Sequence, residues 1–529
     1  MRRFSSYGPV DTDLHYYVPR QELVDRACAE LLGDDPAKGG HYITVLAPRQ
    51  RGKTWVMGQA ILALQREPAF QVVYLTLEYL RTTADPDRVA QLIARDLCKA
   101  LSLTEIKIGA LDEFAQLFTN DVLTRPLILI LDEFDALTEG AISGLAGVFR
   151  NIYLQRQRQT DRASAEKDYL LHSVALIGVR GVLGIESRAG SPFNVQRSLH
   201  IPNLTFAEVE AMFRWYARES GQPVAQAVID RVYAQTRGQP GLTSWLGELL
   251  TETYNPDRSR PLDLAELDRV LLWATDGLGN ANILNLISKA KQEPYRGVVL
   301  ELFRTDEKLL FHYDDPLLSF LYLNGIVDIQ ETPDRLYVQF PCPFVERRLF
   351  NYFARELVAN TGRLYTAFEE LDTVITANRV HVTNLLRRFE RYLQENRDWL
   401  LKDAPRKSDL RPFEAVFHFI LYRYLADFLQ SYHGRVWPEF PTGNGKVDLL
   451  IAYGGTVYGL EVKSFTNLPD YHRSLRQAAA YGRQLGLTEI TLALFVEQVD
   501  DANRAKYEAL FTDAETGVCV APVFVQTGK

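Results

Sequence analysis

The sequence predicts an α/β protein in which two sheet-containing regions are separated by a helical one, and three observations predict it. Short apolar runs alternate with helical patterns over about residues 40–200. Residues 205–350 are mostly helical, and alternating strand patterns return after residue 430. Strands that alternate with helices form parallel sheets that are covered on both faces. The first region is therefore expected to be such a sheet.

Composition narrows the class of protein. The chain has 529 residues, of which 47% are hydrophobic and 24% charged, as in globular proteins of several units. The net charge of −8 argues weakly against a nucleic-acid partner. No stretch approaches the roughly 18 apolar residues of a membrane helix, the first residues lack the apolar run of a signal peptide, and the four cysteines are far apart. We expect a cytoplasmic protein with reduced cysteines and no membrane contact.

The first sheet is predicted from short apolar runs at residues 43–46, 72–75, 127–131 and 173–178. Helical patterns at residues 55–65 and 87–101 separate them.

The middle of the chain has a different pattern. Thr205 and Glu208 have the spacing of a capping box, which predicts the start of a helix. Strand patterns at residues 325–329 and 335–340 follow a helical stretch, and this order resembles a winged-helix unit. Residues 351–407 are again expected to be helical.

One loop carries the chemistry of phosphate binding. Residues 47–54 read Ala-Pro-Arg-Gln-Arg-Gly-Lys-Thr, between a predicted strand and a predicted helix. This matches the P-loop pattern G-x-x-x-x-G-K-[ST], except that Ala47 replaces the first glycine. Gly52 lets backbone N–H groups surround a phosphate, Lys53 reaches the β and γ phosphates, and Thr54 offers a hydroxyl to Mg²⁺. The residues expected to bind ATP here are Ala47, Arg49, Gln50, Arg51, Gly52, Lys53 and Thr54.

An acidic pair completes this site. The apolar run at residues 127–131 leads directly into Asp132 and Glu133. A buried strand that ends in two acids places one carboxylate near Mg²⁺ and one near the attacking water. We assign Asp132 to the metal shell, with Thr54, and Glu133 to activation of the water. Nucleotide binding without hydrolysis is the alternative.

These features resemble AAA-like ATPases of the archaeal-type, STAND-related group. The resemblance covers about residues 15–345 and includes Tyr-Val-Pro-Arg at 17–20, Ser-Pro-Phe-Asn at 191–194 and Thr-Arg-Gly-Gln-Pro at 236–240. It implies that Pro240, in a helical lid, lies near the base or ribose, and that residues 178–180 form a sensor of the γ-phosphate. An arginine finger could be Arg180, Arg188 or Arg197. If a neighbouring subunit supplies it, turnover requires a homo-oligomer.

A second group of chemically suitable residues lies near the C-terminus. Asp448 is on a predicted strand, Gly-Gly at 454–455 marks a turn, and Glu461 and Lys463 share one face of the next strand. A hairpin would bring Asp448 beside them. Two carboxylates and a lysine can bind a divalent metal and position a water against a phosphodiester. Asp448 and Glu461 are the expected metal ligands.

This pattern resembles the PD-(D/E)XK nuclease superfamily, a restriction-endonuclease-like fold, over about residues 405–510. The resemblance implies that Glu414, on the preceding helix, supplements the metal site and that Gln477 contacts the scissile region. Glu439 and the Gln-x-x-x-Tyr spacing of Gln477 and Tyr481 also fit it. It implies Mg²⁺ or Mn²⁺ as cofactor and a nucleic acid, DNA in preference to RNA, as partner.

Basic residues cluster nearby. Residues 387–392 read Arg-Arg-Phe-Glu-Arg-Tyr, and Arg406, Lys407 and Arg411 follow. A solvated helix face is the first interpretation, and a phosphate-contact strip is the second.

The sequence therefore predicts four parts: an ATPase core (1–204), a helical lid with a winged-helix-like region (205–350), a helical connector (351–410) and a nuclease-like domain (411–529). The favoured function is an ATP-regulated, metal-dependent nuclease, with a role in defence or mobile-element biology suggested by analogy alone. The alternative is a STAND-like switch or scaffold whose C-terminal domain binds nucleic acid or protein without cleavage.

Overall fold

The structure, a computed structural model, describes residues 1–8, 10–178, 196–303, 309–364, 369, 371–406, 412, 414–441 and 446–528, apart from the side chains of 196, 414, 439–441 and 446. The chain divides into two compact units. The first comprises Met1–Leu278 and Asp314–Gly325, and the second comprises Gly279–Tyr313 and Ile326–Lys529. The four predicted boundaries stay predictions.

The first unit contains a five-stranded parallel sheet in the order β2-β3-β4-β1-β5. Its strands are β1 (Tyr42–Leu46), β2 (Gln71–Thr76), β3 (Leu127–Asp132), β4 (Leu171–Gly178) and β5 (Gln196–His200). The four predicted strands are confirmed, and β5 was not predicted. Four of its five residues are polar and only Leu199 is apolar, so the strand does not form an apolar run.

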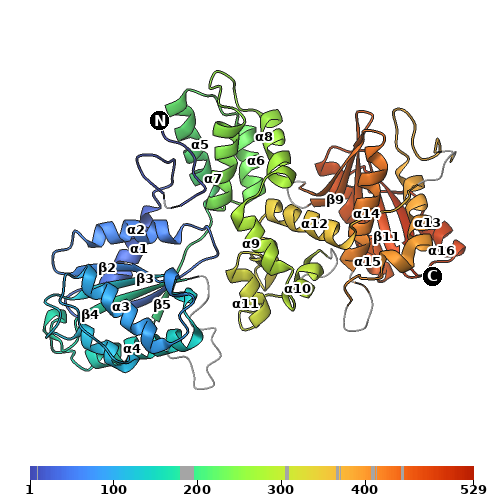
Figure 1. The fold of residues 1–529 in the computed structure, drawn as a ribbon. Coiled ribbons are helices and arrows are strands. Elements are labelled where there is room, and N and C mark those ends of the chain that lie inside the picture. The colour runs from blue at the N-terminus through green and yellow to red at the C-terminus, as the bar shows by residue number, and fades with distance from the viewer. Residues whose placement is uncertain are drawn as a thin grey trace. The chain divides into compact units, whose positions relative to one another are not determined.

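Helices cover both faces of this sheet (Figure 1). On one face lie α1 (Gln21–Leu32) and α2 (Lys53–Leu64), and on the other lie α3 (Pro86–Ala100) and α4 (Glu139–Gln157). Every residue of β3 is buried, and its side chains alternate between the two cores. Leu129 packs with the α3 and α4 side, and Ile130 with the α1 and α2 side. This two-sided burial explains why the strand is apolar throughout.

The first unit contains further helices outside the sheet layers. They are α5 (Phe206–Ser220), α6 (Gln226–Thr236), α7 (Pro240–Glu248), α8 (Leu264–Leu272) and α11 (Pro316–Leu323). The predicted capping box begins α5, because the Glu208 N–H donates to Thr205 Oγ1 at 3.2 Å and the Thr205 N–H donates to Glu208 Oε2 at 2.7 Å. Short 3₁₀ or π segments are Glu78–Leu80, Leu111–Phe118, Phe134–Ala136, Ser164–Glu166, Leu249–Thr253 and Trp273–Gly277.

The second unit begins with α9 (Ala281–Ala290) and α10 (Tyr295–Leu302), followed by an antiparallel hairpin of β6 (Asp328–Glu331) and β7 (Leu336–Gln339). The predicted hairpin is confirmed. The winged-helix unit stays a prediction, since α11, which precedes the hairpin, belongs to the first unit. After α12 (Pro343–Leu357), residues 371–381 are not helical, which corrects the expected helical stretch at 351–407. There the chain turns back through the Ile375–Val380 bridge before α13 (Val382–Leu400).

A six-stranded sheet in the order β12-β13-β11-β10-β9-β8 forms the core of the second unit. Its strands are β8 (Arg435–Pro441), β9 (Lys446–Tyr453), β10 (Thr456–Ser464), β11 (Glu489–Val496), β12 (Phe511–Thr512) and β13 (Cys519–Gln526). Its helices are α14 (Glu414–Gln430), α15 (Leu468–Gln484) and α16 (Asp501–Tyr507). The strands β8, β9 and β10 are antiparallel neighbours, whereas β10, β11 and β13 are parallel.

The β9–β10 turn fixes the register of this sheet. Gly454 and Gly455 have φ values of 56° and 77°, and two consecutive positive φ angles are typical of the two-residue hairpin turn that matches strand twist. The predicted turn is confirmed. It pairs Leu449 with Leu460, which brings Asp448 level with the middle of β10.

Candidate functional site

The P-loop, residues 47–54, joins β1 to α2 at the carboxyl end of the first sheet, where parallel α/β sheets bind ligands. Gln50 and Gly52 have φ values of 59° and 88°. A Cβ built on Gly52 would meet no atom within 4 Å, so the loop leaves open space beside the first turn of α2. Ala47 is not among the residues with positive φ, which explains why alanine serves where many such loops have glycine.

Lys53 lies inside this loop. Its Nζ donates to the carbonyl oxygens of Ala47 at 2.6 Å and Pro48 at 3.1 Å. Burial lowers the pKa of Lys53 to about 8, and nearby carboxylates, Asp135 first, oppose that shift. A phosphate would satisfy this ammonium better than neutral carbonyls do, because hydrogen bonds between charged groups are the stronger ones.

Asp132 ends β3 beside the P-loop. Its Oδ2 accepts a hydrogen bond from Tyr74 Oη at 2.8 Å and a long one from Thr54 Oγ1 at 3.5 Å, and its Oδ1 accepts the Glu133 N–H at 2.9 Å. The hydroxyl and carboxylate that were predicted to share Mg²⁺ therefore lie side by side. This pair fits the metal, since oxygen ligands of this kind hold Mg²⁺ beside a nucleotide.

Glu133 follows in a left-handed conformation, with φ 54° and ψ 38°. Such a conformation costs a non-glycine residue about 1–2 kcal/mol and turns the side chain away from the strand direction. Burial, then Asp135 and Asp132, raise the pKa of Glu133. A carboxylate with a raised pKa is a better base toward water than an ordinary one.

The second predicted site lies on one face of the other sheet. Asp448, Glu461 and Lys463 are 1%, 1% and 3% exposed. Lys463 Nζ lies 3.2 Å from Glu461 Oε1, and Asp448 Oδ2 accepts the Val462 N–H at 2.7 Å. The regular pairing of β9 with β10 ends at Leu449, so the Asp448 side chain takes the place of the next backbone acceptor.

Two oxygens of this site lack a protein donor. Asp448 Oδ1 and Glu461 Oε2 are buried without a hydrogen bond in the described structure. Burial and the proximity of Asp448 raise the pKa of Glu461 well above its ordinary range, although Lys463 opposes the shift. Leaving two buried acceptors unsatisfied is costly, and a divalent cation is the kind of group that would satisfy both.

Helix α15 adds two predicted residues. Gln477 Nε2 donates to Tyr481 Oη at 2.8 Å, and Glu461 helps to raise the pKa of that tyrosine, which places the pair near the acids. The side chains of Glu414 and Glu439 lie outside the described residues. In the described part of the chain, no three His, Cys, Asp or Glu side chains form a metal cluster.

The predicted basic strip has another role. Arg388 is 7% exposed and pairs with Glu369, so a solvated face and a phosphate-contact strip are both wrong for this residue. Arg387 donates to the Phe524 carbonyl oxygen at 2.6 Å and pairs with Glu508. These guanidinium groups hold α13 in its unit. Lys407 and Arg411 lie outside the described residues.

Comparison with known families bears on the first unit. Residues 5–252 match the model of a family described as the AAA-like domain. This part of the chain is therefore similar to AAA-like domains, and we call residues 5–252 the AAA-like domain. The match includes the P-loop, Asp132, Glu133 and Pro240, and it stops well before the second sheet.

The solved structures that are similar to this chain are distant from it in sequence. One is the Walker-type ATPase PABY2304 of Pyrococcus abyssi, at 14% identity and a TM-score of 0.45, covering 65% of this chain and 99% of that one. Another is the Aeropyrum pernix ORC1 protein in complex with DNA, at 16% identity and a TM-score of 0.34, covering 65% of this chain and 95% of that one. A third is the Thermotoga maritima RuvB Holliday junction branch migration motor, at 14% identity and a TM-score of 0.33, covering 60% of this chain and 92% of that one. Such low scores assign no role to any residue. No curated protein matches the sequence.

Helix α7 and the residue before it, in the predicted lid, contact the P-loop. The Gly241 N–H donates to the Gln50 carbonyl oxygen at 3.2 Å, and Gln239 Nε2 lies 3.5 Å from the Arg49 carbonyl oxygen. Pro240 lies between these two lid residues at the start of α7. Its predicted place near a base or ribose stays a prediction.

The arginines of this domain differ in their surroundings. Arg51 is buried, and Arg49 Nε is buried without a hydrogen bond in the described structure. Arg197 pairs with Glu30 at 3.2 Å and Asp34 at 3.5 Å. The other finger candidates, Arg180 and Arg188, and most of the predicted sensor lie outside the described residues.

Among the residues that the structure describes, no helix is long and apolar enough to cross a membrane.

Two residues of the nucleotide site were missed by sequence reasoning. Tyr74 was counted only as part of a strand, yet it contacts Asp132. Asp135 lies beside the end of β4, since a Cβ on Gly178 would approach its Oδ1 to 2.9 Å. Asp135 also exerts the largest opposing effect on the pKa of Lys53. The available signal was a third acid, three residues after Asp132.

Proposed function

We propose that the AAA-like domain binds and hydrolyses ATP with Mg²⁺ and so controls a metal-dependent nuclease in the C-terminal region, which cleaves DNA or RNA. The observation that carries the nuclease half is the meeting of Asp448, Glu461 and Lys463 on one sheet face, with two buried carboxylate oxygens that lack donors among the described residues.

The nucleotide half assigns roles as follows. The P-loop backbone and Lys53 hold the phosphates, and Thr54 and Asp132 hold Mg²⁺. Glu133 orients and deprotonates the attacking water. Its raised pKa and its position next to Asp132 support this role. Arg49, whose buried Nε lacks a hydrogen bond in the described structure, is a further phosphate contact.

The nuclease half rests on the order of elements as well as on the three side chains. A helix, α14, precedes three antiparallel strands that carry Asp448, Glu461 and Lys463, and α15 with Gln477 leads to the parallel β11. This order supports a relation to PD-(D/E)XK nucleases. Asp448 and Glu461, with Glu414, would hold a divalent cation that acidifies water and offsets phosphate charge. Lys463 then orients the nucleophile, and Gln477 contacts the scissile region.

Asp448, Glu461 and Lys463, which we call the triad, are buried, and this affects how cleavage would be controlled. A phosphodiester cannot reach side chains that are 1–3% exposed, so the site has to open before it can cleave. We assign that opening to the nucleotide state of the AAA-like domain. The rival proposal is a STAND-like switch whose C-terminal region binds nucleic acid or protein without cleavage. The same burial and the net charge of −8 favour it.

A nuclease assay on the full chain separates the two proposals. Single- and double-stranded DNA and RNA are incubated with Mg²⁺ or Mn²⁺, with and without ATP. We expect nucleotide-dependent cleavage that falls at least about 100-fold in Glu461→Gln and Lys463→Ala, since general catalysis by one group contributes about 10²–10⁴-fold. Glu489→Gln, an exposed carboxylate on the same sheet, is the matched control.

The outcomes point in different directions. Undiminished cleavage by Lys463→Ala would show that the assigned site is wrong. Nucleotide-dependent binding of nucleic acid with no cleavage under either metal would favour the switch.

A further inference from the structure

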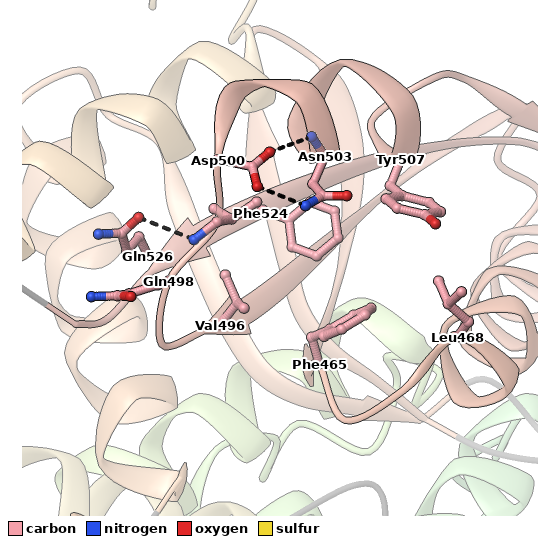
Figure 2. A pocket seen from close by; sticks show the side chains of 10 residues that line it. Phe465, Leu468, Val496, Gln498, Asp500, Asn503, Tyr507, Phe524 and Gln526 are labelled. Carbon is pink, nitrogen blue, oxygen red and sulfur yellow. Dashed lines mark hydrogen bonds between the residues drawn. The ribbon is translucent and has the colours of Figure 1, made fainter.

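A cavity of about 570 Å³ opens at the carboxyl ends of β10, β11 and β13, within the second unit (Figure 2). Its size is in the range of small-ligand sites, about 300–1,000 Å³. Nothing in the predicted nuclease chemistry uses it. Its lining residues are Phe465, Leu468, Val496, Gln498, Val499, Asp500, Asn503, Tyr507, Phe524 and Gln526.

Strand register places this cavity next to the triad. Lys463 pairs with Leu494, which pairs with Phe524, so these three share a row across the sheet. The next row on the same face holds Phe465, Val496 and Gln526, because Phe465 continues the ladder and Val496 pairs with Gln526. Side chains two residues apart on a strand lie about 7 Å apart on one face. The cavity therefore begins one row beyond Lys463.

The lining combines rings with amides. Figure 2 shows Phe465, Phe524 and Tyr507 around the hollow and the amides of Gln498 and Gln526 together at one end. The rings of Phe465 and Phe524 have centroids 5.5 Å apart at an angle of 65°, and Phe524 is buried and stacked on Tyr471. Phe465 and Tyr507 are only half-buried, so these two rings are the ones that the lining offers for stacking. Gln526 Oε1 accepts the Val499 N–H at 3.3 Å, which holds that amide at the end of the cavity.

Charge excludes a phosphate as the occupant. The lining residues include no Lys or Arg, and the one acid, Asp500, accepts two hydrogen bonds from Asn503. A positive charge lies outside, where Lys506 Nζ is 4.9 Å from the centroid of the Tyr507 ring. Proteins bind unstacked bases by stacking them on aromatic side chains, and amide side chains form hydrogen bonds with base edges.

We infer that this cavity receives an unstacked nucleobase of a single strand, next to the phosphodiester held at the triad. The inference rests on the proposed function, which places the phosphodiester at the triad. It adds that the substrate has a single-stranded segment in which one base is turned out of the stack. Ring stacking supplies affinity, and the two glutamine amides contact the edge of the base.

The test is a binding cycle on the full chain carrying Glu461→Gln, so that no strand is cut, carried out with Mg²⁺ and both with and without ATP, since the proposed function assigns opening of the site to the nucleotide state. Fluorescence anisotropy measures the affinity of a single-stranded DNA of about 12 nucleotides, a length within the range of single-strand sites, and of the same DNA with an abasic nucleotide at each position in turn. We expect one abasic position to weaken binding about 5- to 100-fold, since base stacking on an aromatic ring contributes that much.

Variants of the pocket residues then test whether the cavity is the place where that base binds. Phe465→Ala and, as a variant that keeps every ring in place, Gln526→Ala should weaken binding of intact DNA but not of the DNA that lacks that base. Trp399→Ala removes an exposed ring outside the pocket and should change neither. Equal weakening of intact and abasic strands would overturn the inference.

The result distinguishes the two proposals. Cleavage by the wild-type protein without any position-specific abasic effect overturns the base pocket and leaves the nuclease. A position-specific effect without cleavage under either metal overturns the nuclease and leaves the base pocket.

Discussion

The two candidate sites are built in opposite ways. The nucleotide site is assembled from loops at strand ends, with positive φ angles at Gln50, Gly52 and Glu133. The triad lies on the faces of regular strands, where Asp448, Glu461 and Lys463 keep extended backbone. The first leaves open space beside Gly52, whereas the second is almost fully buried.

This difference determines where free energy is stored. At the nucleotide site the backbone is strained, and a phosphate would give the Lys53 ammonium a charged partner in place of two neutral carbonyl oxygens. At the triad the backbone is relaxed, and the cost lies in two buried acceptors that have no donor in the part of the chain that the structure describes. A mutation should therefore reduce ligand binding or turnover at the first site, and should raise the stability of the metal-free protein at the second.

The largest effect is expected from Glu133→Gln. The amide keeps the size of the side chain but cannot take a proton from water, so ATP hydrolysis should fall by about 10²–10⁴-fold. ATP affinity should change little, because Thr54 and Asp132 remain in place. Phosphate release and equilibrium binding of a fluorescent ATP analogue measure the two quantities. Glu139→Gln, an exposed acid that begins α4, is the control. Unchanged hydrolysis would remove Glu133 from the mechanism.

Lys53→Ala should reduce ATP affinity about 100-fold or more. It removes a half-buried charge that would face phosphate, and hydrogen bonds between charged groups contribute about 1.5–3 kcal/mol each, of which an ammonium can make two to the phosphates. Isothermal titration calorimetry with ATP and Mg²⁺ measures the loss. Lys38→Ala, which removes an exposed lysine of the same unit, should bind as the wild type does. If Lys53→Ala retains wild-type affinity, the P-loop is not the nucleotide site.

The same contrast explains what the sequence could predict. The P-loop residues are contiguous, and the strand before Asp132 is uniformly apolar, so both could be predicted without tertiary structure. The contact of Tyr74 with Asp132 depends on the pairing of β2 with β3, which local sequence does not determine. The face shared by Asp448, Glu461 and Lys463 followed from alternation and one turn, but their burial depends on helices packed from elsewhere in the chain.

Glu461→Gln replaces a buried carboxylate by an amide that can donate to Asp448, which offsets the loss of the charged partner of Lys463. It should stabilise the metal-free protein by about 1–3 kcal/mol above the raised pKa of Glu461. The raised pKa of Glu461 gives the sign of the pH dependence. The folded state holds this proton more tightly, so its contribution to stability is complete below the ordinary carboxyl range and is lost as pH rises through the raised pKa. In EDTA, the wild type should lose more stability than the variant as pH increases.

Thermal denaturation between about pH 6 and 9, with Glu489→Gln as the control, measures this effect. Added Mg²⁺ or Mn²⁺ should stabilise the wild type and the control but not Glu461→Gln. A variant that is less stable than the wild type in EDTA at every pH would show that the two carboxylates do not form a site for a cation.

The smallest effect concerns the contact between lid and P-loop. A Cβ on Gly241 would lie 2.3 Å from Gln50 Oε1 and 2.7 Å from its Cβ, so Gly241→Ala should push α7 from the loop at a cost of about 1–3 kcal/mol. Part of that cost should appear as ATP binding that is a few-fold weaker. Gly147→Ala, in a helix where a Cβ meets nothing within 4 Å, should leave affinity unchanged. Equal affinities of the two variants would mean that the lid contact contributes nothing to nucleotide binding, and that the P-loop holds its strained backbone unaided.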